Sequence, residues 1–202
     1  GSGGGEGPPE YHESLLEACQ RGASEPEVMR CLLREGGIEG VPIPQADERG
    51  RTALMWACHH GHDLGVVRVL LTQGNAAINQ ADRDGATALS IASGKGHVGV
   101  VRYLVTEAHA NVNQANNYGA TPLHIACYEG HLEVVRYLVS EAHAAVNQAH
   151  NEGATPLCIA SDRGFFGVVR FLACSRARVT QLDSPVWQNE QVLRALVQGC
   201  QD

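Results

Sequence analysis

Histidines and cysteines are the residues of this sequence whose chemistry could support metal binding or catalysis. Three histidines stand close together, since His59, His60 and His62 occur in the stretch HHGH, and imidazole is a common zinc ligand. His59 and His60 are adjacent, however, so on a helix their side chains point in different directions. His62 recurs at equivalent positions as His97 and His131, which a structural role explains. The paired ligand spacings of zinc sites are missing, and we predict no metal site.

The seven cysteines suggest either disulfides or a nucleophile. Their number is odd and no two of them form a C-x-x-C pair, which is a poor disulfide framework. Reduced thiols fit an intracellular location, cytoplasmic or nuclear, better than a secreted one. Cys19, Cys58 and Cys127 share their position in a repeated pattern with serines, which indicates small packing residues. Cys158 is expected closer to the surface, but no histidine–acid pair accompanies it, so we predict that the chain is not an enzyme.

Composition limits the partners that the chain can bind. Of the 202 residues, 44% are hydrophobic but only 5% are aromatic, so aliphatic residues must form the core, which favours helices. The formal net charge of −7 argues against nucleic acid, because binding to it depends on neutralising phosphates. No apolar run approaches the roughly 20 residues that cross a bilayer, and no signal-peptide pattern is present. The glycines match no phosphate-binding loop, so we expect no cofactor, no nucleic acid and no membrane partner.

Three sequence markers recur with one period. The string GATPL and its variants begin at glycines 35, 34 and 34 residues apart, which are Gly50, Gly85, Gly119 and Gly153. The markers VNQA and VVR, with small variations, keep the same rhythm. Such repetition at a fixed period indicates an array of similar structural units.

One period can be interpreted as two short helices and an extended turn. Thr121 is a favourable N-cap and Pro122 suits the first helical turn, whereas Gly130 suits a left-handed C-cap. A second helix is expected over about residues 132–141, with apolar residues along one face, before a turn rich in Asn and Gly. Because a single helix pair cannot bury its apolar face, the units must stack on one another.

The string TPLHIA, together with Gly130-His131 and LEVV, closely resembles the ankyrin repeat. The resemblance covers roughly residues 11–182 and implies an all-α solenoid of stacked helix-turn-helix units with extended turns and a C-terminal capping helix. The expected boundaries are 1–10 for a flexible tail, about 11–45 for a degenerate first unit, 46–80, 81–114, 115–148 and 149–182 for the other four, and 183–202 for the capping helix and tail.

Two columns of the repeat carry further expectations. Ala108 and Ala142 replace the glycine that is usual after the second helix, so we expect those helices to run slightly longer or to end without a left-handed turn. Asn79, Asn113 and Asn147 stand in the column whose side chains usually tie neighbouring turns together. In this family the same column is a target of asparaginyl hydroxylation, which we keep as a minor alternative.

The resemblance also implies a binding surface, namely a concave groove lined by the turn tips and the exposed side of the first helices. Residues at these positions vary between units while framework residues do not, and Tyr and Arg combine contact area with hydrogen-bonding tips. The candidate binding residues are Arg49, Arg51, His59, His60, Arg83, Lys95, Tyr118, Tyr128, Glu129, Asp162 and Arg163. The wider face includes Glu48, Asp84, Ser90, Asn117, His124, Asn151 and Glu152.

We therefore predict a non-catalytic, monomeric module that binds a partner protein or an extended peptide of mixed charge. The alternative is a targeting or regulatory segment of a larger multidomain enzyme or channel. A third hypothesis is a purely structural spacer, for which mutation of groove residues would change no binding event. The sequence names no partner, because a fold does not determine a function.

Overall fold

The computed structural model describes residues 14–34, 46–61, 64–72 and 76–175 of the chain. Within these ranges the regular structure is helical, apart from two isolated bridges between strand-like residues. The helices are α1 (Leu15–Gln20), α2 (Glu25–Arg34), α3 (Ala53–His60), α4 (Leu64–Thr72), α5 (Ala88–Lys95), α6 (Val98–Thr106), α7 (Pro122–Glu129), α8 (Leu132–Ser140), α9 (Pro156–Asp162) and α10 (Phe166–Cys174). The predicted tail at 1–10 and capping helix at 183–202 lie outside the described residues, and the unit boundaries remain predictions.

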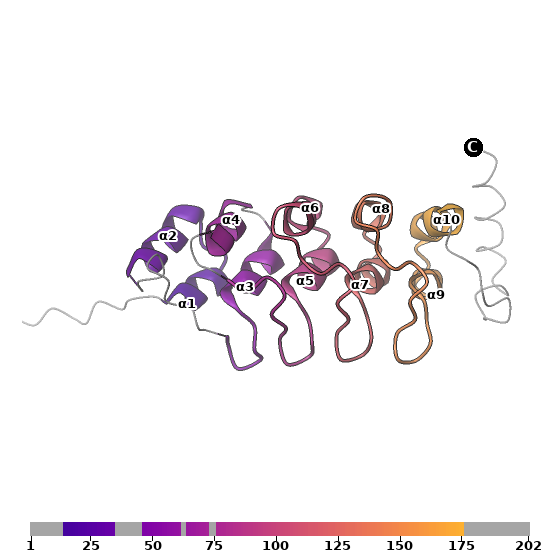
Figure 1. Ribbon diagram of the computed structural model, residues 1–202, viewed down its shortest axis with the longest axis horizontal. Helices are drawn as coiled ribbons and strands as arrows, with labels where there is room; N and C mark the ends of the chain where they lie inside the picture. Colours follow the sequence, from indigo (N-terminus) through magenta and orange to yellow (C-terminus); the bar gives the residue numbers. More distant parts are fainter. Residues whose placement is uncertain (1–13, 35–45, 62–63, 73–75, 176–202) are drawn as a thin grey trace, which may run out of the picture.

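The helices form two layers that stack in sequence order (Figure 1). The odd-numbered helices, α1 to α9, make one layer, and the even-numbered helices, α2 to α10, make the other. Hairpin-shaped turns project from the odd-numbered layer on the side away from the even-numbered helices. Each helix packs against its equivalent in the next unit and against its own partner helix. The predicted all-α solenoid is therefore confirmed.

Helix α7 begins and ends at the residues that the sequence predicts. Thr121 is the N-cap of α7 in an extended conformation and Pro122 occupies the first turn. Gly130 ends the helix in the left-handed region with a φ of 78°, which glycine adopts without steric strain. The second helix, α8, covers nearly all of the predicted range 132–141. Threonines are also the N-caps of α3, α5 and α9.

Small residues fill the seams between first helices, and larger aliphatic residues fill the second layer. The cysteines of the predicted packing column, Cys19, Cys58 and Cys127, are buried. Burial raises the pKa of the Cys127 thiol to about 12 and also raises that of Cys58, so both remain protonated and unreactive. The second helices bury valine and leucine columns, which are Val67, Val101, Val135 and Val169, with Leu70, Leu104, Leu138 and Leu172.

The ends of the second helices differ from the prediction. α6 and α8 end at Thr106 and Ser140, before Ala108 and Ala142, so neither helix extends into these alanines. A left-handed residue still follows them, but it is His109 (φ 54°) and His143 (φ 55°), directly after Ala108 and Ala142. Histidine is one of the non-glycine residues that tolerate this region best. The turn is thus retained one residue later.

Hydrogen bonds tie each hairpin to the next. The side-chain oxygen of Asn79 accepts from the backbone N–H of Asn111 at 2.8 Å, and that of Asn113 accepts from Ala145 at 2.8 Å, as predicted for these two asparagines. At the hairpin tips, backbone N–H groups donate to carbonyls of the preceding hairpin at 3.0 Å, in the pairs Arg83–Arg49, Asn117–Asp84 and Asn151–Tyr118. The hairpins therefore form a continuous, cross-linked wall.

Candidate partner-binding groove

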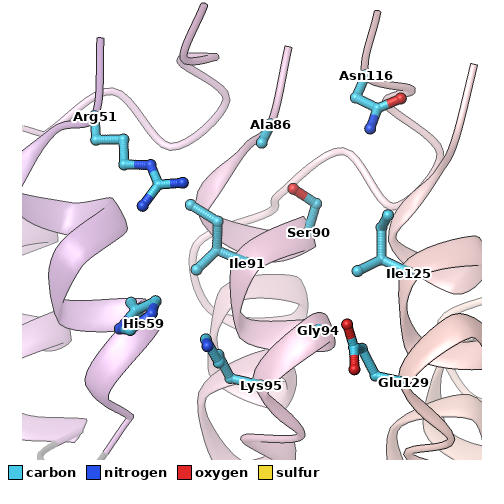
Figure 2. A pocket seen from close by; sticks show the side chains of 10 residues that line it. All are labelled: Arg51, His59, Ala86, Ser90, Ile91, Gly94, Lys95, Asn116, Ile125 and Glu129. Carbon is cyan, nitrogen blue, oxygen red and sulfur yellow. The ribbon is translucent and has the colours of Figure 1, made fainter. Parts of the chain in front are cut away.

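Two hollows lie where the hairpins meet the first helices. The first, of about 250 Å³, lies among α3, α5 and α7, and the second, of about 350 Å³, lies between α7 and α9. Ile125 lines both, so the hollows adjoin, and we call them together the hairpin groove. Figure 2 shows the first hollow, with Lys95 and Glu129 reaching one end of it from neighbouring helices.

The floor of the groove is a row of equivalent apolar residues. Ile91, Ile125 and Ile159 are half-buried and line the hollows, and Trp56 occupies the same position in α3. None of these four residues was among the predicted contact residues. The sequence does show an apolar residue at this position in each of these four units. Sequence alone, however, does not distinguish half-buried from buried residues.

Arg51 and Trp56 form a wall at the α3 end of the groove. The Arg51 guanidinium lies over the Trp56 ring, 5.4 Å from its centroid, and its Nε is 3.6 Å from Oδ2 of Asp82. Trp56 in turn donates from Nε1 to Oδ2 of Asp47 at 3.1 Å. The residues equivalent to Arg51 in the next three units are alanines, Ala86, Ala120 and Ala154. The groove is therefore narrowed by bulky side chains at one end and open along the alanines.

A missing side chain opens the first hollow. Gly94 occupies the position that carries His59, Tyr128 and Asp162 in the neighbouring units. A Cβ atom on Gly94 would lie 2.7 Å from Cγ2 of Ile125, so even alanine would force the floor to move. Burial lowers the pKa of His59, and the positive charge of Lys95 lowers it further. His59 is thus a neutral neighbour of a charged lysine at pH 7.

The second hollow is bordered by an aromatic–cation pair and two carboxylates. The Arg163 guanidinium stacks on the Tyr128 ring at 4.1 Å from its centroid and donates from Nε to the Tyr128 carbonyl at 3.2 Å. Tyr128 is 45% exposed, so part of its ring remains accessible beside this stack. Glu152 and Asp162 are exposed and form no ion pair with any residue in the described ranges.

Ser90 and His124 each line a hollow of the groove, but the prediction that they are exposed is wrong, because both are buried. They complete the N-caps of their helices instead. Ser90 accepts from the Thr87 N–H at 2.9 Å, and Nδ1 of His124 accepts from the Thr121 N–H at 3.2 Å. Burial, aided by the neighbouring His150, lowers the pKa of His124 to about 4.

The structure brings seven of the eleven candidate residues to the hairpin groove. Those in the first hollow are Arg51, His59, Lys95 and Glu129, and those in the second are Tyr128, Asp162 and Arg163.

The other four candidates line neither hollow. Arg49, Arg83 and Tyr118 lie at the hairpin tips, where Tyr118 is 66% exposed. His60 faces the first unit, with Nε2 at 2.8 Å from the Gln20 carbonyl. In the part of the chain that the structure describes, no three His, Cys, Asp or Glu side chains gather as a metal-binding group. In the same part, no helix has the length and apolar character needed to span a membrane.

Comparison with known proteins accounts for this arrangement. Residues 15–116 and 105–183 match the family model for ankyrin repeats in three copies. The chain belongs to the ankyrin-repeat family. Ankyrin repeats are generally protein–protein interaction modules and are typically non-catalytic.

The relatives of this ankyrin-repeat chain share only part of their length with it. It is 36% identical over 93 residues to the photoreceptor ankyrin repeat protein of Homo sapiens, a match that covers 43% of this chain and 20% of that protein. It is 42% identical over 66 residues to osteoclast-stimulating factor 1 of Gallus gallus, covering 33% of this chain and 29% of that protein. It is 37% identical over 73 residues to Inversin-B of Xenopus laevis, covering 36% of this chain and 7% of that protein.

Proposed function

We propose that this chain is a non-catalytic interaction module that binds an extended segment of a partner protein in the hairpin groove. The observation that carries the proposal is the row of Ile91, Ile125 and Ile159, half-buried and open to the groove, with charged side chains on both sides. An apolar floor with a polar rim is the usual anatomy of a protein interface. A specific complex would bury about 1,200–2,000 Å² in total, which requires contacts along several units.

The rigidity of the groove supports the proposal. One side is formed by hairpins that are joined through backbone hydrogen bonds at 3.0 Å, and the other side is formed by the capped first helices. A site whose shape is already fixed spends less free energy on ordering when a partner binds. Lys95, Glu129 and Asp162 then supply the polar contacts, and Tyr128 supplies an aromatic surface. Arg49, Arg83 and Tyr118 would extend the contact to the hairpin tips.

Affinity capture from the native cell tests the proposal. The wild-type chain is compared with the groove variant Lys95→Ala/Tyr128→Ala and with the control Arg68→Ala/Arg170→Ala, whose exposed arginines lie on α4 and α10. Thermal denaturation checks that both variants fold. We expect at least one captured protein to fall about tenfold with the groove variant and to stay constant with the control. A partner lost with both variants, or with neither, would contradict the groove assignment.

A second proposal is that these repeats act as the targeting or regulatory segment of a larger protein. It is favoured by the short coverage of the relatives, in which the matched stretch takes up 20%, 29% and 7% of the three proteins named above. The sequence of the full-length transcript tests it. An enzyme or channel domain joined to the repeats would support it, and a transcript that encodes repeats alone would remove it.

A further inference from the structure

The two hollows of the hairpin groove differ in the sign of their charge. Histidines apart, the first hollow is lined by two cations and one carboxylate, and the second is lined by two carboxylates and one cation. These side chains are, in that order, Arg51, Lys95 and Glu129, then Glu152, Asp162 and Arg163. The net charge that lines the groove therefore changes from positive to negative between the first hollow and the second.

In the first hollow, Lys95 is the cation left for a partner. The Arg51 guanidinium is partly neutralised by Asp82, at 3.6 Å, and its side chain is only 27% exposed. Lys95 is exposed and forms no ion pair with the residues that the structure describes. Glu129 approaches the same end of the hollow from α7 (Figure 2) but not within ion-pair distance of Lys95.

In the second hollow, the carboxylates are the charges left for a partner. Arg163 is held by Tyr128, both through the ring at 4.1 Å and through the carbonyl at 3.2 Å. It therefore does not neutralise Asp162 or Glu152, which lack an ion pair in the described ranges. Two neighbouring carboxylates without a cation attract a basic side chain.

Between the charged groups the groove is apolar. Ile125 lines both hollows, and the gap left by Gly94 exposes the floor between Ile91 and Ile125. The wall of Arg51 and Trp56 narrows the groove on the far side of the first hollow. A bound chain is thus directed from the first hollow towards the second.

Building on the proposed function, we propose that the groove selects a peptide with one acidic and one basic side chain on either side of an apolar one. The acidic side chain lies beside Lys95, the apolar one over Ile125, and the basic one beside Asp162 and Glu152. Neighbouring packed helices are about 8–10 Å apart, so α5 and α9 are separated by roughly 16–20 Å. An extended chain rises about 3.3 Å per residue, which places the two charges about five or six residues apart.

Selection from a peptide library displayed on phage, with the whole chain as bait, tests this inference. Selected peptides are then made with a fluorescent label, and their affinities are measured by anisotropy for the wild type, Lys95→Glu, Asp162→Lys and the back-face control Arg68→Glu. Exposed ion pairs contribute up to about 1 kcal/mol, so reversing one charge should weaken binding about five- to tenfold. Arg68→Glu should leave the affinity unchanged.

Charge exchange in the peptide locates each contact. Binding to Lys95→Glu should be restored when the acidic residue of the peptide becomes lysine, but not when its basic residue becomes glutamate. For Asp162→Lys the pattern should be the opposite. Rescue of both variants by the same exchange, or rescue of neither variant by its matched exchange, would overturn the inference.

The selection also separates this inference from the proposed function. Peptides that bind tightly without the charge pair, yet are weakened by Tyr128→Ala, would overturn the inference and leave groove binding intact. Peptides that ignore all groove variants but respond to Arg68→Glu would overturn both. Recovery of no peptide would count against the inference, because a groove fitted to such a segment must retain it from a random library.

Discussion

The inner and the outer seams of the stack satisfy the same backbone carbonyl in different ways. Near the end of each first helix, two residues before the terminal glycine, a carbonyl faces the next unit. In the two inner seams, histidine side chains reach it, with Nε2 of His97 at 3.1 Å from the His59 carbonyl and Nε2 of His131 at 3.0 Å from that of Gly94. These histidines belong to the framework column, and they follow the terminal glycine of the next first helix.

In the outer seams the donor comes from a different column. His60 is 2.8 Å from the Gln20 carbonyl in the first seam, and Nε of Arg163 donates to the Tyr128 carbonyl at 3.2 Å in the last. In the last seam, Phe165 stands where the framework has histidine, and its ring has no N–H to donate. Arg163 thus replaces the missing histidine as the hydrogen-bond donor of this seam. The column that holds His60 and Arg163 varies between units, yet at these two seams its side chains contact a carbonyl of the preceding unit.

The largest effect should come from an inner seam, through His131→Ala. It removes the donor to the Gly94 carbonyl and the ring that lies against Gly96, where an added Cβ would be 2.6 Å from Nδ1. The loss of this partly buried hydrogen bond together with the lost packing should lower the free energy of unfolding by about 2–3 kcal/mol. Urea denaturation measures this, with Arg68→Ala as a control that should change it by less than about 0.5 kcal/mol. Equal effects of the two variants would contradict the role of His131.

The next effect is a pH dependence at the junction of α7 with the last hairpin, where the His124 ring lies 5.9 Å from that of His150. The pKa of His124 is lowered by burial from 6.5 to about 4, so the unfolded chain takes up its proton first as the pH falls. The contribution of neutral His124 to the free energy of unfolding is complete above pH 6.5 and is lost as the pH falls towards the folded pKa. At pH 5 the loss should be about 1–2 kcal/mol.

The variant that isolates this effect is His124→Ser. It gives α7 the same capping residue that α5 has at the equivalent position, Ser90. Urea denaturation between pH 5 and pH 7 should give a flatter profile for the variant than for the wild type. If both profiles have the same slope, His124 is not the titrating group.

The outer seam should be weaker than the inner one. Arg163→Ala removes the hydrogen bond to the Tyr128 carbonyl and the stack on its ring, and because Arg163 is exposed we expect a loss of about 1 kcal/mol. Phe165→His should recover much of this loss in the Arg163→Ala background by restoring the framework donor. A double-mutant cycle by thermal denaturation measures the coupling. Strictly additive effects would show that the two side chains do not serve the same carbonyl.

The smallest effect belongs to the outer surface of the second layer. Arg102 forms a two-point ion pair with Glu141, at 3.0 and 2.8 Å, and lies 4.6 Å from the centroid of the Tyr137 ring. Both charged side chains are about half exposed, so Arg102→Ala should lower the free energy of unfolding by about 0.5 kcal/mol. The difference from wild type should shrink in high salt, since exposed charges are screened. If Arg102→Ala lowered the free energy of unfolding as much as His131→Ala does, this surface ion pair would not be the weaker of the two contacts.

The sequence was sufficient for the fold because the repeated residues act locally. Thr121, Pro122 and Gly130 define the start and end of α7 through capping and backbone geometry, which do not depend on distant contacts. The shifted left-handed turns at His109 and His143 were not predicted, because a pattern that expects glycine gives no reason to expect histidine.

The candidate site was predicted less completely. Lys95, Glu129 and Asp162 were assigned to the groove because the two columns that they occupy vary between units, and all three line its hollows. The same criterion gave no sign that the ring of His60 faces the first unit or that Arg163 contacts the Tyr128 carbonyl. Phe165 in the framework column was the available signal that a donor had been replaced, but its meaning depends on knowing which carbonyl the histidine serves.

The hairpin tips have an evolutionary consequence through their lateral hydrogen bonds. Asn117 and Asn151 add side-chain bonds between the tips, but the three bonds from Arg83, Asn117 and Asn151 N–H groups to the preceding hairpin use main-chain atoms only. These three bonds do not depend on which side chains their acceptor residues carry. Substitutions at Arg49, Asp84 or Tyr118 can therefore accumulate without separating one hairpin from the next. An array built in this way can acquire a new client by point mutation while its scaffold is inherited unchanged.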